Sequence, residues 1–198
     1  MIVFDLGGVL AEPDHKELDT AQLLGVDVEA LIGPYWAHRQ AYDEGSGNLE
    51  YWTRVGAALG VEVSPELADR LGTADSDAWA RIRPSARQIL ADLHAAGVPT
   101  AILSNAPVDM YEAIDRAEWR DLVGPLFVSG VLGVAKPELE IFAHVARTLD
   151  LDPGDLWFID DKLLNVHGAI ASGWHAHHWT SDDDTRAWLE AIGALPRG

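Results

Sequence analysis

Acidic residues follow two widely separated apolar runs of this chain. The run at residues 2–4 (IVF) leads into Asp5, and the run at residues 156–159 (LWFI) leads into Asp160 and Asp161. A carboxylate at the tip of a buried strand is costly unless a cation, a proton or hydrogen bonds compensate its charge. Two such tips in one chain therefore predict carboxylates that converge on a metal ion.

Strands and helices alternate in the sequence pattern from residue 84 onward. The predicted strands after this point cover residues 100–103, 126–128, 156–159 and 175–179, and the predicted helices cover residues 86–93, 108–118, a stretch after Pro137, 164–172 and 183–192. Together with the first strand, this alternation predicts an α/β fold in which a doubly wound parallel sheet has helices on both faces.

The segment between the first strand and residue 82 is predicted to be helical throughout. Ser64 and Pro65 form a helix start, and an apolar repeat of helical spacing over residues 49–59 ends at Gly60. Aromatic residues at positions 35, 36, 42 and 52 also lie on helical stretches and are expected mainly in a core of their own. We therefore expect a core domain of residues 1–14 and 83–198, with a helical cap of residues 15–82 inserted into it.

The predicted strands bring the polar residues to one place. In a doubly wound sheet, ligands bind outside the carboxyl ends of the strands. Asp5, Ser104 and the Asp160–Asp161 pair each follow directly on a strand run, so we expect them at the same edge of the sheet. Lys136, followed by Pro137, precedes the helix that leads to the strand with the double acid.

The series Asp5, Ser104, Lys136 and Asp160–Asp161 resembles the four-part signature of the haloacid dehalogenase-like hydrolases, and the resemblance covers the whole chain. The stretch from Tyr42 to Trp52 resembles the cap segment of the same group. The resemblance implies a Rossmann-like core with a small helical cap. It also implies a central first strand, flanked by the strands that end at Leu103 and Ile159.

The resemblance assigns a role to each motif. Asp5 would attack phosphorus and form an aspartyl-phosphate, which divides hydrolysis into two easier displacements. Ser104 and Asn105 would hold the oxygens of the phosphoryl group. Lys136 would neutralise the charge of that group and of the crowded carboxylates.

The same resemblance implies a Mg²⁺ site. Asp5, the main-chain carbonyl of Gly7 and Asp161 would be the protein ligands, and Asp160 and Asn165 would lie just outside them. Mg²⁺ prefers hard oxygen ligands, few protein carboxylates and several waters, which this set allows. A carbonyl comes from any residue, so a glycine at position 7 is compatible with metal binding.

Gly7 is nevertheless a departure from the family pattern. Most phosphatases of this group carry a second Asp there, which protonates the leaving oxygen and then activates water. General acid–base catalysis of this kind contributes about 10²–10⁴ in rate. Without it, turnover is slow, or the leaving groups are good, or the protein no longer catalyses, or a nearby acid substitutes; the candidate acids are Glu12, Asp14 and Asp160.

Three functions remain open at this point. The first is Mg²⁺-dependent hydrolysis of a small phosphorylated metabolite, of which a sugar phosphate is one example, with Arg39 or His38 of the cap reaching its organic part. The second is 2-haloacid dehalogenation, which needs no metal. Without a cation, two acids beside the nucleophile would raise its pKa and reduce its reactivity, so the double Asp favours the phosphatase. The third is a catalytically impaired protein that binds phosphorylated ligands.

Composition limits the partners. The chain has 32 acidic residues against 14 Lys and Arg, a formal charge of −18, which repels nucleic acids and anionic membranes. It contains no cysteine, which excludes thiolate chemistry, and no run approaches the roughly 20 apolar residues of a membrane span.

Because the first strand starts directly after Met1, we expect no signal peptide and a cytoplasmic location. His175 and His177 share a strand face, but no neighbouring pattern completes a zinc site. The oligomeric state is not indicated.

Overall fold

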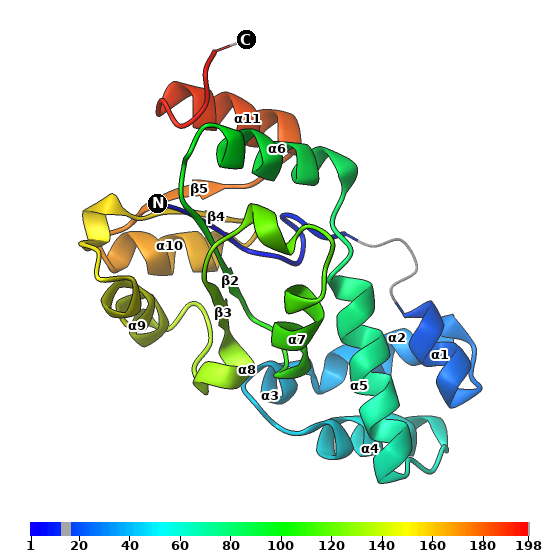
Figure 1. Cartoon of the computed structure of the whole chain (residues 1–198). Coiled ribbons are helices and arrows are strands. Elements are labelled where there is room, and N and C mark those ends of the chain that lie inside the picture. Colours follow the sequence, from blue (N-terminus) through cyan, green and yellow to red (C-terminus); the bar gives the residue numbers. More distant parts are fainter. Residues whose placement is uncertain (13–16, 198) are drawn as a thin grey trace.

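A parallel sheet of five strands forms the centre of the core in the computed structural model, which describes residues 1–12 and 17–197 (Figure 1). The strands are β1 (Ile2–Phe4), β2 (Thr100–Ser104), β3 (Leu126–Val128), β4 (Trp157–Asp160) and β5 (His175–His178), in the spatial order β3-β2-β1-β4-β5. In the register, Ile2 lies opposite Thr100 on one side and Trp157 on the other. This confirms the predicted α/β fold with a central first strand.

Helices fill most of the remaining sequence. Those before the second strand are α1 (Leu18–Leu24), α2 (Val28–Ala37), α3 (Arg39–Asp43), α4 (Asn48–Leu59), α5 (Pro65–Trp79) and α6 (Pro84–Ala95). Those after it are α7 (Asp109–Asp115), α8 (Ser129–Leu132), α9 (Leu139–Leu149), α10 (Leu163–Ala171) and α11 (Asp182–Ala191), with short 3₁₀ turns at Arg120–Leu122 and Pro153–Asp155. The predicted starts at Pro65 and after Pro137 and the predicted end at Gly60 are confirmed. The helical stretch around Tyr35 and Tyr42 breaks at His38 into α2 and α3, and α8 was not predicted.

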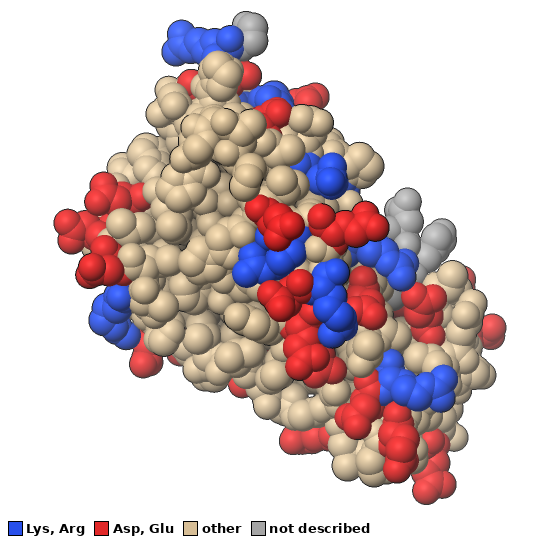
Figure 2. Space-filling model, in the orientation of Figure 1, with Lys and Arg blue, Asp and Glu red and all other residues tan. Residues whose placement is uncertain are grey.

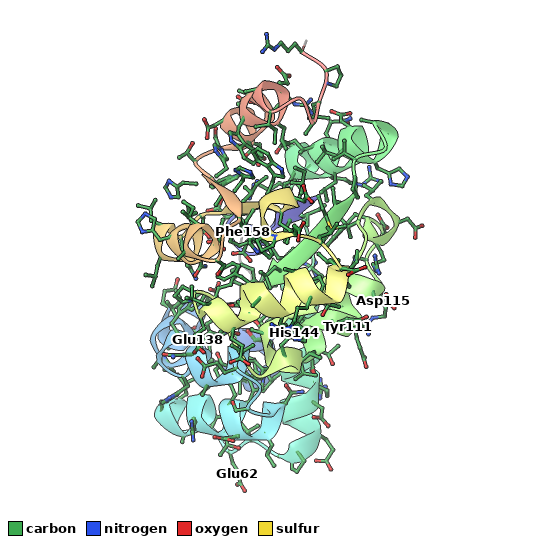
Figure 3. All side chains as sticks on the ribbon, turned by 90° about the vertical axis from the view of Figure 1, so that its left-hand side faces the viewer. Glu62, Tyr111, Asp115, Glu138, His144 and Phe158 are labelled. Atoms are coloured by element: carbon green, nitrogen blue, oxygen red, sulfur yellow. The ribbon has the colours of Figure 1, made fainter. Side chains whose placement is uncertain are left out.

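The two faces of the sheet have separate apolar cores. Helices α6, α7 and α11 pack on one face, against Ile2, Phe4 and Ile102, while α9 and α10 pack on the other. Phe158 of β4, labelled in Figure 3, lies in this second core with its ring 5.7 Å from that of Phe142. Because both faces are covered, β1 to β4 are almost wholly apolar and carry polar residues only at their ends. The edge strand β5, with three histidines, is the exception.

Helices α1 to α5 surround a third apolar core, built largely from aromatic side chains. Tyr35, Tyr51 and Trp52 are fully buried in it, and the rings of Tyr42 and Tyr51 stack 4.0 Å apart. Glu62, in the loop between α4 and α5, lies at the end of this cap farthest from the sheet (Figure 3). The expected aromatic cap core is therefore present for Tyr35, Tyr42 and Trp52, whereas Trp36 is exposed and lies outside it. The predicted boundary at residues 14 and 15 lies outside the described residues.

The cap and the core touch beside the end of β3. Gly45 has a φ of 106°, and a Cβ on it would lie 2.8 Å from the carbonyl oxygen of Gly130. Asn48 of α4 donates a hydrogen bond of 2.8 Å to Asp109 of α7. This close backbone approach depends on glycine at position 45, because other residues rarely adopt such a φ and their Cβ would meet the Gly130 carbonyl.

Charged side chains cover both parts of the molecule. Figure 2 shows acidic residues on the core and on the cap, with basic residues among them where α5 meets α7. At that contact Arg116 lies 3.1 Å from Asp77. Within residues 1–12 and 17–197, no helix is long and apolar enough to cross a membrane.

We predict that Gly45→Ser destabilises the protein by about 1–3 kcal/mol, because serine is strained at this φ and its Cβ meets the Gly130 carbonyl. The free energy of unfolding in urea measures the effect. Gly47→Ser is the matched control in the same connection. Gly47 precedes α4 with a φ of −72° and open space around its Cα, and serine is a favoured residue there. Equal stabilities of the two variants would contradict the prediction.

Candidate active site

The carboxyl ends of β1, β2 and β4 meet at a cavity of about 240 Å³ between core and cap. Most of the site residues expected from the sequence line it, namely Asp5, Gly7, Arg39, Ser104, Asn105, Asp161 and Asn165. The other two, Lys136 and Asp160, are buried. The Lys136 ammonium pairs with both Asp5 and Asp160 and so connects them. The structure thus brings the predicted residues together, while their roles stay predictions.

Lys136 lies at the centre of a buried charge cluster. Its Nζ is 2.9 Å from Asp5 Oδ1 and 2.7 Å from Asp160 Oδ2, and it donates a third hydrogen bond of 2.9 Å to the carbonyl of Leu103. Its side chain is 0% exposed. Burial by itself would lower the pKa of Lys136, but the charges of Asp160 and Asp5 outweigh burial and raise it. The lysine is therefore a fixed cation with all three donors used.

The Asn105 side chain holds the main chain of Lys136. Its Nδ2 donates to the Lys136 carbonyl at 2.8 Å, and its Oδ1 accepts from the Lys136 N–H at 2.9 Å. These two bonds fix the loop that delivers the ammonium to Asp5, a positioning role that the sequence did not suggest. Contact of Asn105 and Ser104 with a phosphoryl group stays a prediction.

Asp160 has no room for a further ligand. Its Oδ1 accepts from the Lys162 N–H at 2.8 Å and from Asn165 Nδ2 at 3.0 Å. Its Oδ2 accepts from Lys136 at 2.7 Å and from the same Asn165 amide at 3.0 Å. Asn165 and Asp160 therefore hold the lysine in place, while their position outside the metal ligands stays a prediction.

Asp5 and Asp161 are the carboxylates left to bind a cation. Oxygen atoms of Asp5, Asp160 and Asp161 lie within 4.8 Å of one another, and Asp161 Oδ1 is buried without a hydrogen-bond partner. Asp5 Oδ1 pairs with the Lys136 ammonium and accepts a hydrogen bond of 2.7 Å from the Leu6 N–H. Oδ2 is therefore the Asp5 oxygen that remains available. An orphaned carboxylate oxygen beside a second carboxylate fits a hard cation such as Mg²⁺.

The burial of these acids changes their pKa values. Burial, partly opposed by Lys136 and reinforced by Asp160, raises the pKa of Asp5 from 3.8 to about 7. Burial and the charge of Asp160 also raise the pKa of Asp161. Gly8 allows this crowding, because its φ is 83° and a Cβ on it would lie 2.7 Å from the Asp161 carboxylate.

At Gly7 the structure shows what replaces the usual acidic side chain. A Cβ on Gly7 would lie 3.2 Å from the ring of Trp79, at the end of α5, and Trp79 also lines the cavity. Of the candidate substitute acids, Asp160 has both oxygens occupied by hydrogen bonds. Glu12 lines the cavity with a side chain that is 70% exposed. Asp14 lies outside the described residues.

Arg39 of the cap is held by neighbouring acids. Its Nε lies 2.7 Å from Asp43 Oδ1 and its Nη1 lies 2.9 Å from Asp75 Oδ2. The guanidinium still lines the cavity, so its contact with a substrate stays a prediction, while His38 at the break between α2 and α3 does not line it. On β5, His175 stacks on Trp157 and His177 on Trp188, so these rings are used in packing.

Comparison with known families gives one match over most of the chain. Residues 1–173 match the sequence model of the haloacid dehalogenase-like hydrolases. The HAD family enzyme bt-2542 of Bacteroides thetaiotaomicron has a similar structure, with a TM-score of 0.72 and 20% identity over 96% of this chain and 97% of that one. Its asp12ala mutant was solved in complex with magnesium and inorganic phosphate.

Curated relatives carry two kinds of names. The sesquiterpene phosphatase astK of Aspergillus oryzae is 35% identical over 50% of this chain, and the matched region spans about half of that protein, 52%. The phosphatase MT3486 of Mycobacterium tuberculosis is 25% identical over 100% of this chain and 96% of its own. The (S)-2-haloacid dehalogenase 4A of Burkholderia cepacia is 27% identical over 87% of this chain and 79% of its own.

We predict that Lys136→Met lowers the free energy of unfolding by about 3–5 kcal/mol, because it leaves Asp5 and Asp160 buried without their cation. Urea unfolding in EDTA measures the loss. Lys162→Met makes the same chemical change at an exposed lysine and should cost less than about 1 kcal/mol. Comparable losses in the two variants would show that the buried cluster does not depend on Lys136.

The raised pKa of Asp5 predicts a pH dependence of stability in the absence of metal. The folded protein keeps a proton on Asp5 between its ordinary pKa of 3.8 and its folded pKa of about 7, whereas the unfolded chain releases it. The contribution of Asp5 is therefore fully present below 3.8 and is lost as pH rises through about 7. The difference in unfolding free energy between wild type and Asp5→Asn, measured in EDTA, should fall over this window; a difference that rises with pH would refute the assignment.

Proposed function

The chain belongs to the haloacid dehalogenase-like hydrolases, and from this premise we propose that it is a Mg²⁺-dependent phosphatase of small phosphorylated metabolites that uses Asp5 as nucleophile. The observation that carries the proposal is the buried, unpaired Asp161 Oδ1 beside Asp5, over a lysine whose donors are all occupied. A phosphatase of this kind needs a cation where the dianionic phosphoryl group meets two carboxylates. The magnesium and phosphate complex of the bt-2542 mutant supports the choice of metal.

Each residue of the cavity has a place in this reaction. Mg²⁺, held by Asp5, Asp161 and the Gly7 carbonyl, would neutralise the charges of nucleophile and phosphoryl group. One carboxylate oxygen of Asp5 attacks phosphorus, while Lys136 and the Leu6 N–H hold Oδ1 in position. Ser104 and the main chain after it bind the phosphoryl oxygens, and Asn105 keeps Lys136 in position.

Two alternatives differ from this proposal in chemistry. A 2-haloacid dehalogenase is favoured by the similarity to haloacid dehalogenase 4A. A dehalogenase has no use for the partnerless Oδ1 of Asp161, and the charge of this carboxylate would only raise the pKa of the nucleophile further. A protein that binds phosphorylated ligands without turnover is favoured by the glycine at position 7. We place both behind the phosphatase, because two curated relatives are phosphatases by name.

The substrate is proposed only by class. The net charge of −18 disfavours large polyanions, and a cavity of about 240 Å³ between core and cap limits the size of the ester. A sugar phosphate fits these limits. So does an ester with an apolar group, since Trp36 and Trp79 line the cavity on the cap side.

We predict that the protein hydrolyses p-nitrophenyl phosphate in Mg²⁺, that EDTA abolishes this activity, and that no chloride is released from chloroacetate. Asp5→Asn should reduce hydrolysis to background, since it keeps the shape and removes the attacking charge. Chloride release in EDTA would establish the dehalogenase instead. Tight phosphate binding without hydrolysis of any ester would establish the binding protein.

The metal assignment predicts a separate effect of Asp161→Asn. The Mg²⁺ concentration for half-maximal activity should rise by more than the roughly 10–100-fold that loss of an outer-sphere partner causes. Asp152→Asn, the same change at an exposed acid before β4, is the control and should leave the metal requirement unchanged. An unchanged metal requirement in Asp161→Asn would remove this residue from the site.

A further inference from the structure

The proposed reaction lacks an acid for the leaving group, because position 7 is glycine. Within the described residues, four carboxylates line the cavity: Asp5, Glu12, Asp43 and Asp161. Asp5 is the proposed nucleophile, and Asp161 has the unpaired oxygen that fits the metal. Glu12 is 70% exposed, and its nearest cation is Arg83 at 3.9 Å, so water surrounds it. Asp43, from the cap, is the remaining carboxylate.

The main chain fixes Asp43 beside the proposed phosphate loop. The Ser129 hydroxyl donates a hydrogen bond to the carbonyl of Asp43 and accepts one of 2.9 Å from the N–H of Ala106. Ala106 directly follows Ser104 and Asn105. A single hydroxyl therefore joins the end of α3 to the loop after β2. The Gly45–Gly130 contact brings the connection after α3 against α8, the helix that carries Ser129.

The Asp43 side chain has one oxygen fixed and one available. Oδ1 lies 2.7 Å from Arg39 Nε, whereas no hydrogen bond to Oδ2 is found among the described residues. The side chain is 17% exposed. The charged groups that act on it are Arg39 on its own helix, Asp75 on α5 and Lys162 of the core. Burial, opposed by Arg39, raises the pKa of Asp43 from 3.8 to about 6, so the protonated form is accessible near neutral pH.

One hydrogen-bond chain connects Asp43 to the ring that covers Gly7. Trp79 Nε1 donates to the Tyr35 hydroxyl at 2.9 Å, and this hydroxyl donates to Asp75 Oδ1 at 2.7 Å. Arg39 donates to the Tyr35 hydroxyl and to Asp75 and holds Asp43. The cap thus places an indole where the usual acid would extend and a carboxyl group at another wall of the same cavity.

We propose that Asp43 is the general acid and base of this enzyme and takes over the role that an aspartate at position 7 has in related phosphatases. The inference rests on the proposed phosphatase function. It assigns to a cap residue a step for which the described core residues provide no available acid.

The step balances as two displacements. In the first, an Asp5 oxygen bonds to phosphorus, the bond from phosphorus to the leaving oxygen breaks, and that oxygen takes the proton of the Asp43 carboxyl group. In the second, water attacks the aspartyl-phosphate, gives its proton to the Asp43 carboxylate, and the bond from phosphorus to Asp5 breaks. The products are the alcohol and inorganic phosphate, and both aspartates return to their initial states.

The test compares leaving groups in wild type and Asp43→Asn with Mg²⁺ present. Since kcat/KM reports only the steps up to leaving-group departure, acid catalysis should matter for alkyl esters and little for p-nitrophenyl phosphate. We expect kcat/KM for alkyl phosphates to fall by about 10²–10⁴, and that for p-nitrophenyl phosphate by less than about threefold. A burst of p-nitrophenolate equal to the enzyme concentration should appear, because the second step has lost its base.

Three further variants keep the outcomes separate. Glu44→Gln, at an exposed acid next to Asp43, should change neither kcat/KM, and Glu12→Gln should not separate the two ester classes. If Asp43→Asn does not fold, Asp43→Ser gives the same comparison. Equal loss for alkyl and aryl esters, or a separation in Glu12→Gln instead, overturns the role of Asp43 and leaves the phosphatase intact. Absence of turnover of any ester by wild type overturns both.

Discussion

The rest of the site depends on the burial of one lysine ammonium between two carboxylates. Lys136 reaches Asp5 directly after β1, Asp160 at the end of β4 and the Leu103 carbonyl on β2, so it joins three adjacent strands. A shift of one residue in the pairing of β1 or β4 would turn the aspartate that follows or ends that strand to the other face of the sheet and remove one partner of the ammonium. Such a cluster is poor as a source of stability, because burying charges is costly, but it accepts only one strand register.

A second cluster of the same kind lies across the cavity. Arg39 in the cap stands between Asp43 and Asp75, as Lys136 in the core stands between Asp5 and Asp160. In each cluster the cation holds one oxygen of an acid that lines the cavity and leaves its other oxygen available. The two clusters thus present carboxyl groups from opposite walls, and the proposed division into a nucleophile and an acid follows from this arrangement.

Local sequence features predicted helix ends well where a capping residue decided the end by itself. Serine followed by proline at positions 64 and 65 starts α5, and Gly60 ends α4 in a left-handed conformation. They failed at His38, where tertiary packing divides one aromatic-rich helix into two. Local sequence features also did not predict that the Ser129 hydroxyl joins Ala106 and Asp43, which are 23 and 86 residues away from it.

The sequence by itself determined the edge of the sheet at which the polar residues meet, since the carboxyl ends of parallel strands lie together whatever surrounds them. Only the tertiary structure decided which oxygens remain open there. Asp160 and Asp161 are adjacent in the chain, yet one is saturated and the other keeps a buried oxygen without a partner. Asp43 has one local partner, Arg39 at i−4 on its own helix. Its burial and the Ser129 hydrogen bond to its carbonyl depend on long-range contacts, which are set by packing and which no local pattern encodes.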